Sequence, residues 1–265
     1  MKEEHFAILR RHMVEVIGIY VDLAGDELGR STLDERVLTA IGRVPRHAFV
    51  PAPLAAHAYQ DTALPIGFDK TISQPFIVAV MTDLLAPRPD DVVLEIGTGL
   101  GYQAAVLGQL VRRVWSVEII EELAVEAAAR LRQLGYDNVG IHIGDGSLGW
   151  AGHAPYDKII ITAAAELVPP ALLQQVRPGG RMVLPTGLAE DQKLTVVEKD
   201  ATGRAHVENS CPSGSVCSRR CGEHGRPAVV GRASGSSLWA RATSCPSRHA
   251  YASIRRRHPV GACRP

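Results

Sequence analysis

The sequence predicts an α/β fold in which an N-terminal helical extension precedes a doubly wound, mostly parallel sheet. Two observations lead to this prediction. Between residues 92 and 199, short apolar runs typical of buried strands alternate with segments whose apolar residues recur at helical spacing. Before residue 90 the apolar positions follow helical spacing, as in residues 3–23. Right-handed crossovers between the strands then place helices on both faces of the sheet.

The first 90 residues are predicted to hold three helices joined by irregular segments. The helices cover residues 3–23, 37–43 and 76–85, and a glycine or proline follows each one closely. Two prolines make residues 44–51 an irregular connection, in which Arg46 and His47 are expected at the surface. Residues 59–75 form a loop, and by composition alone Ser73 is the N-cap of the third helix.

The alternating part of the chain is predicted to contain six strands and three helices. Each strand is a short run rich in Val, Ile or Leu that turn-forming or charged residues interrupt. Ligands of such sheets bind at the carboxyl ends of the strands. The predicted strands span residues 92–95, 114–118, 139–143, 158–162, 181–185 and 193–199, and the helices span residues 102–110, 121–134 and 170–176.

The first of these strands runs into a glycine-rich turn. Glu95 is followed at alternate positions by Gly97, Gly99 and Gly101, and a helix begins at Tyr102. A dinucleotide-binding turn, G-x-G-x-x-G, needs glycine where this chain has Tyr102. A carboxylate before the first glycine repels a pyrophosphate and attracts a cationic amino group. The pattern favours S-adenosylmethionine (SAM), which has an ammonium and a sulfonium, over NAD; a tight turn without a ligand is the third interpretation.

Three acidic residues end successive predicted strands. Glu95 ends the first, Glu118 the second and Asp145 follows the third. Because the carboxyl ends of parallel strands meet at one edge of the sheet, these side chains are expected to line one pocket. An ionised carboxylate only accepts hydrogen bonds, so Glu118 suits the two hydroxyls of a ribose and Asp145 suits the exocyclic amine of adenine. The set predicts a site for an adenosine-type cofactor.

Composition places the chain among ordinary globular proteins. It has 265 residues, 46% apolar residues and a net charge of +1, so no general affinity for nucleic acid or membrane is expected. No apolar run reaches the roughly 18 residues of a membrane span, and the N-terminus lacks a signal-peptide core. All five cysteines follow residue 210, which excludes a disulfide framework for the core. We expect a cytoplasmic, metal-free monomer.

Several longer segments resemble the protein-L-isoaspartate O-methyltransferase family. The resemblance covers roughly residues 5–205, and the segments before the glycine turn are not shared by SAM methyltransferases in general. The matching segments are DERVLTAIGRVPRHAFVP (34–51), AYQDTALPIG (58–67), TISQP (71–75), LEIGTGLGYQAA (94–105), VEI (117–119), GDG (144–146), APYDKIIITAAA (154–165) and RPGGRMVLPTG (177–187).

The resemblance implies a Rossmann-like SAM-dependent methyltransferase fold and an activity in protein repair. Such an enzyme methylates the free α-carboxylate of L-isoaspartyl residues in damaged proteins, using SAM, and the ester closes spontaneously to a succinimide that can reopen to aspartate. Two alternatives remain open. One is a SAM-dependent methyltransferase of another acceptor, and the other is a SAM-binding protein whose catalysis is impaired.

The resemblance also implies a role for each site residue. Ser73 becomes the catalytic residue, which holds the substrate carboxylate at the edge of the cofactor site. The cofactor-binding residues are then Thr71, Ile72 and Ser73 on the loop, Glu95, Gly97, Gly99 and Gly101 at the methionine end, Glu118 at the ribose, and Asp145 with Gly146 at the adenine.

The last part of the chain departs from the family. Residues 208–265 contain ten Arg and no Lys, ten Ser and two acidic residues, without periodicity. The closing strand of the family, an aromatic-Pro-Leu-like segment, is not found, so an unpaired sheet edge and low activity are expected. We interpret this tail as disordered or as a frameshift product; zinc binding through Cys217, Cys221 and His224 and nucleic-acid contact through Arg255–Arg257 are the weaker alternatives. The predicted organisation is residues 1–90, 91–207 and 208–265.

Overall fold

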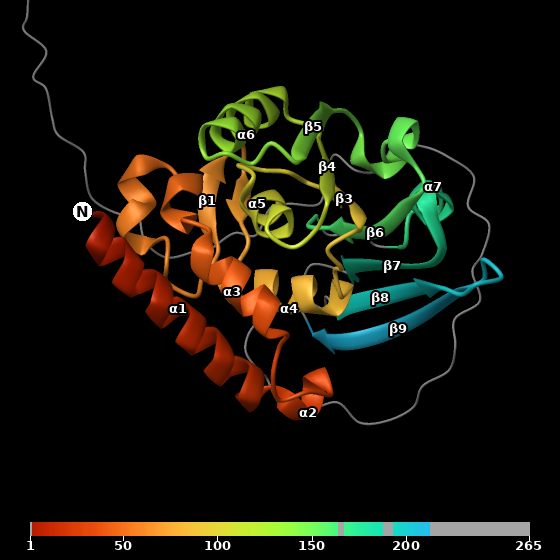
Figure 1. Ribbon diagram of the computed structural model, residues 1–265, viewed down its shortest axis with the longest axis horizontal. Coiled ribbons are helices and arrows are strands. Elements are labelled where there is room, and N and C mark those ends of the chain that lie inside the picture. The colour runs from red at the N-terminus through yellow and green to blue at the C-terminus, as the bar shows by residue number, and fades with distance from the viewer. Residues whose placement is uncertain (1, 164–166, 188–192, 213–265) are drawn as a thin grey trace, which may run out of the picture.

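A single sheet forms the centre of the computed structural model, which describes residues 2–163, 167–187 and 193–212 (Figure 1). The sheet is parallel from its first to its fifth strand in space and antiparallel beyond it. The predicted doubly wound, mostly parallel sheet is therefore confirmed. Within the described residues the order across the sheet is β5 (Val139–Ile143), β4 (Arg113–Glu118), β3 (Val92–Ile96), β6 (Tyr156–Ile161), β7 (Val176–Thr186), β8 (Lys193–Lys199) and β9 (Ala205–Pro212).

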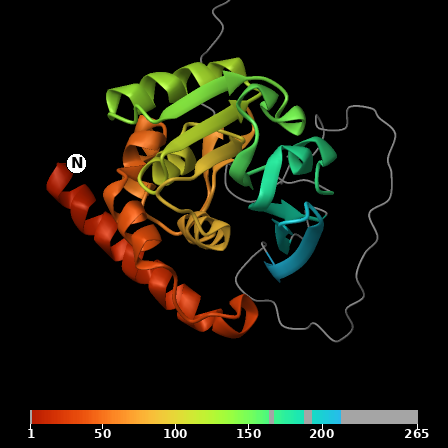
Figure 2. The ribbon, with the colours of Figure 1, turned by 45° about the vertical axis from the view of Figure 1, so that its right-hand side comes forward.

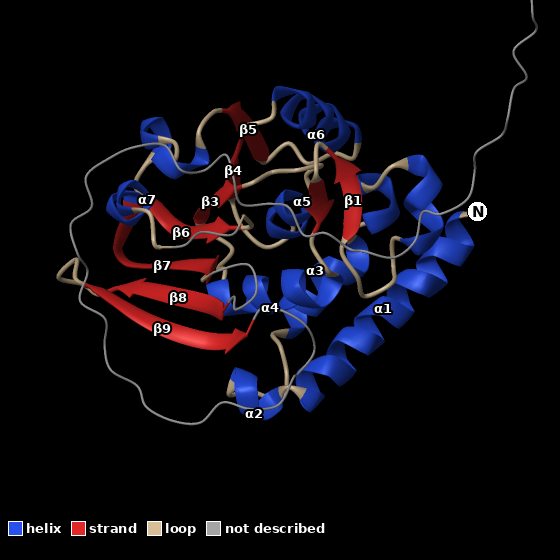
Figure 3. Cartoon of the chain, turned by 180° about the vertical axis from the view of Figure 1, so that it is seen from behind, coloured by secondary structure: helices blue, strands red, loops and turns tan. Residues whose placement is uncertain are grey.

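Most of the helical mass covers one face of the sheet. α4 (Pro75–Leu85) packs on β6, β7 and β8, while α5 (Tyr102–Gly108) and α6 (Glu121–Gln133) pack on β4 and β5. α1 (Glu3–Leu23) and α3 (Glu35–Arg43) contact α4 from outside, and Figure 3 shows these helices gathered on one side of the strands. Because their buried side chains join those of the sheet in one cluster, the N-terminal extension shares the core of the sheet.

The opposite face has a thinner cover. Within the described residues it consists of α7 (Pro170–Gln175) and two short 3-10 turns, η3 (Gly146–Leu148) and η4 (Ala151–His153), which are coloured green to teal in Figure 2. A second apolar cluster, built around Leu94, Ile159 and Met182, fills the space beneath them. Helical elements therefore lie on both faces, as predicted, but one face is covered mainly by turns.

The connections in the first 90 residues carry more regular structure than the sequence predicts. α2 (Gly25–Leu28) follows α1, and η1 (Arg46–Phe49) and η2 (Ala52–His57) occupy the proline-containing segment. The predicted loop at 59–75 contains an antiparallel hairpin of β1 (Leu64–Gly67) and β2 (Lys70–Ile72). The N-cap of α4 is Gln74 and not Ser73, and its side chain makes no capping bond. Instead Asp61 Oδ1 accepts from the Phe76 amide at 2.8 Å.

β9 is a strand that the sequence did not predict. Its main chain pairs with β8 from Ala205 opposite Lys199 to Pro212 opposite Lys193, and α2 contacts it. Among its side chains Val207 is 52% exposed, so the strand lacks the buried alternation that marks most strands. β9 therefore covers the outer edge of β8, and among the described residues no strand pairs with the outer edge of β9. Beyond residue 212 the predicted tail lies outside the described residues.

In the part of the chain that the structure describes, no helix is long and apolar enough to cross a membrane. The same residues contain no group of three or more His, Cys, Asp and Glu side chains arranged to hold a metal ion.

Pairing of β9 makes a testable contribution to stability. A chain that ends at residue 204 exposes the main-chain donors and acceptors of β8, whereas a chain that ends at residue 214 keeps β9. We expect the shorter chain to lose at least ~2 kcal/mol, or roughly 4–8 °C in Tm for a domain of this size, and to scatter more light. Thermal unfolding of the two chains measures this difference, and equal Tm values would show that β9 adds nothing.

Candidate functional site

The glycine turn joins β3 to α5 at the carboxyl edge of the sheet. Gly97 and Gly101 have φ values of 96° and 93°, which side chains with a Cβ rarely adopt. A Cβ at Gly97 would also lie 2.5 Å from Thr162 Oγ1, whose hydroxyl donates to the Gly97 carbonyl at 2.7 Å. The turn is therefore fixed from the neighbouring strand end, and its shape requires glycine.

Glu95 lies beneath this turn with no exposure to solvent. Its Oε2 accepts from the Ser116 hydroxyl, which in turn lies 2.6 Å from Thr98 Oγ1. Its Oε1 has no hydrogen-bond partner among the described residues. Burial raises the pKa of Glu95 to about 8. The hydrogen bond from Ser116 lowers this pKa, and the negative charge of Glu118 raises it further. A buried acceptor without a donor fits the ammonium of a SAM molecule.

Glu118 ends β4 and is tied to the same turn. Its Oε2 accepts from the Gly99 amide at 2.8 Å, and its Oε1 accepts from the Ile120 amide at 3.1 Å. A carboxylate has about four acceptor positions, so two remain for the hydroxyls of a ribose. The side chain is 6% exposed, and the two amide bonds fix its orientation. The ribose role that the resemblance implies for Glu118 stays a prediction.

Asp145 and Gly146 lie one strand further along the same edge. The Gly144 amide donates to the Glu118 carbonyl at 2.9 Å, which places the segment beside β4. Asp145 is exposed, and its Oδ1 accepts from the Ser147 amide at 2.9 Å. A Cβ at Gly146 would lie 2.4 Å from Ile96 Cγ2, so this glycine permits close packing on β3.

Two apolar side chains border this part of the site and were missed by the sequence reasoning. Ile119 directly follows Glu118 and is 62% exposed, and Leu148 follows Asp145 by three residues and is 65% exposed. Large apolar groups left open beside polar acceptors suit a flat ring such as adenine. Gln175 of α7 holds the second of them, because its Nε2 donates to the Leu148 carbonyl at 2.8 Å.

The predicted substrate loop lies against the glycine turn. Thr71 and Ile72 belong to β2, with Thr71 exposed and Ile72 buried, and the half-buried Ser73 follows. The partner strand of this hairpin touches the turn, since a Cβ at Gly99 would lie 3.2 Å from Ile66 Cδ1. The hairpin and the strand ends of the sheet thus meet at the turn.

The prediction that Arg46 and His47 lie at the surface is wrong for Arg46. Its side chain has no exposure, because it lies among the carbonyls of the neighbouring loops and the ring of Tyr102. His47 stacks on Phe6 of α1 at 3.8 Å between ring centres, and its Nδ1 lies 2.7 Å from the Tyr59 hydroxyl. Burial lowers the pKa of His47.

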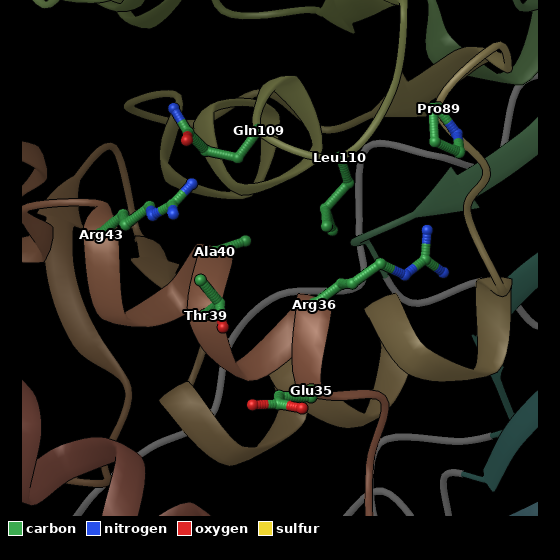
Figure 4. Close-up of a pocket in the computed structure, with 8 residues that line it drawn as sticks. All are labelled: Glu35, Arg36, Thr39, Ala40, Arg43, Pro89, Gln109 and Leu110. Carbon is green, nitrogen blue, oxygen red and sulfur yellow. The ribbon is translucent and has the colours of Figure 1, made fainter.

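A surface hollow of about 400 Å³ lies elsewhere, between α3 and α5 (Figure 4). None of the predicted site residues lines it, so it is not the site that the strand ends define. Its lining residues are Glu35, Arg36, Thr39, Ala40, Arg43, Pro89, Gln109 and Leu110.

The chain is similar to known proteins over most of its length. The family model for protein-L-isoaspartate(D-aspartate) O-methyltransferase (PCMT) matches residues 26–214. Protein-L-isoaspartate O-methyltransferase 1 of Polaromonas sp. strain JS666 is 54% identical over 212 residues, which are 80% of this chain and 90% of that protein. Protein-L-isoaspartate O-methyltransferase 2 of Syntrophobacter fumaroxidans is 50% identical over 211 residues, or 79% and 85% of the two chains.

Two solved structures share the fold. A protein-L-isoaspartate O-methyltransferase has a TM-score of 0.66 and 26% identity, with 77% of this chain and 64% of that chain covered. A Plasmodium falciparum protein described as a putative protein-L-isoaspartate O-methyltransferase, in complex with S-adenosyl-L-homocysteine, has a TM-score of 0.57 and 18% identity over 67% and 88% of the two chains.

The sheet, the glycine turn and these relatives define a SAM-dependent methyltransferase with a Rossmann-like fold. Within that class, the chain belongs to the protein-L-isoaspartate(D-aspartate) O-methyltransferase family. The fold and the family predicted from the sequence are thereby confirmed.

Glu95 is expected to make SAM binding depend on pH. Its carboxyl must release a proton to pair with the ammonium, which remains largely charged below about pH 7.5. We expect the Kd for SAM to fall by up to about tenfold per pH unit between about pH 6 and pH 7.5, as measured by titration calorimetry. Stability without SAM has the opposite trend and falls between pH 4.5 and about 8, because the folded state binds the proton more tightly than the unfolded chain.

Glu95→Gln is the matched control for this pH dependence. Glutamine keeps the size of the side chain but cannot ionise, so SAM binding should weaken and lose its slope. A slope shared by the two proteins would assign the titration to another group.

Proposed function

We propose that this protein transfers the methyl group of SAM to the free α-carboxylate of L-isoaspartyl residues in damaged proteins. One observation carries the proposal. The match to the family is continuous from residue 26 to residue 214, so it includes both the segment around Ser73 and the three acids at the strand ends. In this proposal the acids bind the cofactor, and the Ser73 segment binds the acceptor carboxylate.

The transfer needs positioning more than proton chemistry. A carboxylic acid with a pKa near 4 is already ionised at neutral pH, so the acceptor oxygen attacks without a general base. A bond forms between this oxygen and the methyl carbon as the bond from the carbon to sulfur breaks, and sulfur keeps the electron pair. The products are a methyl ester and S-adenosylhomocysteine, and opposite charges cancel during the step. Exclusion of water from the pair therefore favours the reaction.

The residues of the site divide this task. Glu95 and the turn Gly97–Gly101 hold the methionine end of SAM, Glu118 holds the ribose, and Asp145 with Gly146 holds the adenine. Thr71 and Ile72 line the side of the cofactor that faces the acceptor. Ser73 donates its hydroxyl hydrogen to the acceptor carboxylate and so aligns the attacking oxygen with the methyl group.

The acceptor distinguishes this proposal from its two alternatives. A SAM methyltransferase of another acceptor would leave an isoaspartyl peptide unmodified, and an impaired SAM-binding protein would bind SAM without transfer. The experiment incubates the protein with methyl-labelled SAM and either an isoaspartyl peptide or its aspartyl twin. We expect label in the first peptide alone; label in neither peptide would reject the proposal.

The proposed function also specifies the partners, the oligomeric state and the location of the enzyme. Isoaspartyl-containing proteins and peptides are the proposed partners, without nucleic acid or membrane. Action as a metal-free monomer in the cytoplasm completes the proposal, and it rests on the composition of the sequence.

Removal of the Ser73 hydroxyl tests its role. A hydrogen bond to a charged group contributes about 1.5–3 kcal/mol, so Ser73→Ala should lower kcat/KM for the isoaspartyl peptide by roughly 10- to 100-fold. The Kd for SAM should change little, because the binding groups at the strand ends are intact. Ser31→Ala, an exposed serine in the connection from α2 to α3, is the matched control. Unchanged turnover in Ser73→Ala would remove Ser73 from the mechanism.

A further inference from the structure

Arg46 is a charged side chain withdrawn from solvent, and it donates hydrogen bonds to main-chain carbonyls. Nε donates to Ala58 at 2.7 Å, and Nη2 donates to Ser73 at 2.8 Å and to Thr62 at 3.5 Å. Its exposed fraction is 0%. Withdrawing a cation from water is costly, and here burial lowers the pKa of the guanidinium. Burial of the Arg46 guanidinium therefore has a free-energy cost that stability alone does not explain.

The guanidinium of Arg46 also packs on an aromatic ring beside the glycine turn. Cζ lies 4.8 Å from the centre of the Tyr102 ring, within the range of a cation–π contact. Tyr102 is the first residue of α5 and directly follows Gly101, and the ring of Phe49 packs edge-on against it at 5.7 Å. One planar group therefore contacts both the Ser73 carbonyl and the ring of Tyr102, the residue that directly follows the glycine turn.

Asp61 holds the same segment from its other end. Its Oδ1 accepts from the Phe76 amide at 2.8 Å and its Oδ2 accepts from Gln74 Nε2 at 2.6 Å. Its negative charge also partly offsets the effect of burial on Arg46. The Ser73 carbonyl is thus fixed by a cation, and the residues after it are fixed by an anion.

We propose that Arg46 is a positioning residue for methyl transfer, which sets the distance between the Ser73 segment and the glycine turn. This inference rests on the proposed function. Arg46 touches neither substrate in this role and acts through the Ser73 carbonyl and the Tyr102 ring. In-line transfer is sensitive to such a distance, since a displacement of about 1 Å can cost roughly 100-fold in rate. Lysine cannot replace the planar fork, because its ammonium is a single point of charge.

The test compares Arg46→Lys with Arg181→Lys in the full chain. Arg181 also donates to a main-chain carbonyl, that of Leu84 at 2.8 Å, but it lies on β7 away from the turn. Turnover of the isoaspartyl peptide is divided by the number of SAM-binding sites from calorimetry, so that unfolded protein does not count. We expect kcat per site to fall at least about tenfold in Arg46→Lys, with the Kd for SAM within about twofold. Arg181→Lys should lower Tm and leave kcat per site unchanged.

A merely structural Arg46 predicts the opposite result. Arg46→Lys would then lose stability while its kcat per site stays within about twofold of the wild type, and this outcome would overturn the inference. If Arg46→Lys does not fold, Asp61→Asn replaces it, since Asp61 is only half-buried. We expect Asp61→Asn to lower kcat per site by about threefold to tenfold with SAM binding retained, and an unchanged value would equally overturn the inference. A wild type inactive on the peptide would instead reject the proposed function.

Discussion

Burying an ionisable group at the end of a strand costs free energy, and the site is organised around one such group. Glu95 has no exposure and keeps one carboxyl oxygen without a partner, although Ser116 satisfies the other. A core that served stability alone would place an apolar side chain here. The cost becomes intelligible if a cation completes the site, because the ammonium of SAM supplies both the missing donor and the compensating charge. The pKa of Glu95, which burial raises to about 8, should then fall when a cation binds beside it.

The same logic connects the two halves of the site. Glu118 receives the Gly99 amide, and the turn that carries this amide also lies against Ile66 of the β1–β2 hairpin. Gly99 therefore contacts both Glu118 of β4 and Ile66 of the hairpin, and it links the two parts of the site. The acceptor side has its own buried charge in Arg46. Two buried ionisable groups thus lie near the turn: Glu95, whose pKa burial raises, and Arg46, whose guanidinium donates to main-chain carbonyls.

Sequence patterns predicted the parts of the structure that depend on local chemistry. The six predicted strands were found because each is a short run rich in Val, Ile or Leu, which suits both the five parallel strands and the antiparallel β8. The acids at the ends of the first three were found from their position after these runs. β9 was missed because an edge strand is stabilised by main-chain pairing, which leaves little trace in side chains such as the exposed Val207. Arg46 was misplaced for a related reason. An arginine between two prolines gives no sign that carbonyls distant in sequence will surround it.

The exposed apolar residues beside the site could not be predicted from composition either. Ile119 and Leu148 follow Glu118 and Asp145 closely, yet a large apolar residue after an acid is common, and only the fold shows that both remain open at one edge. Single exposed apolar groups need no explanation. Two of them beside polar acceptors, one held by Gln175 from the opposite face, form a surface that costs solubility unless a ring covers it. The proposed adenine side of the site is bordered by α7 and by the turn at Trp150, whose amide donates to Gln175 Oε1 at 3.0 Å.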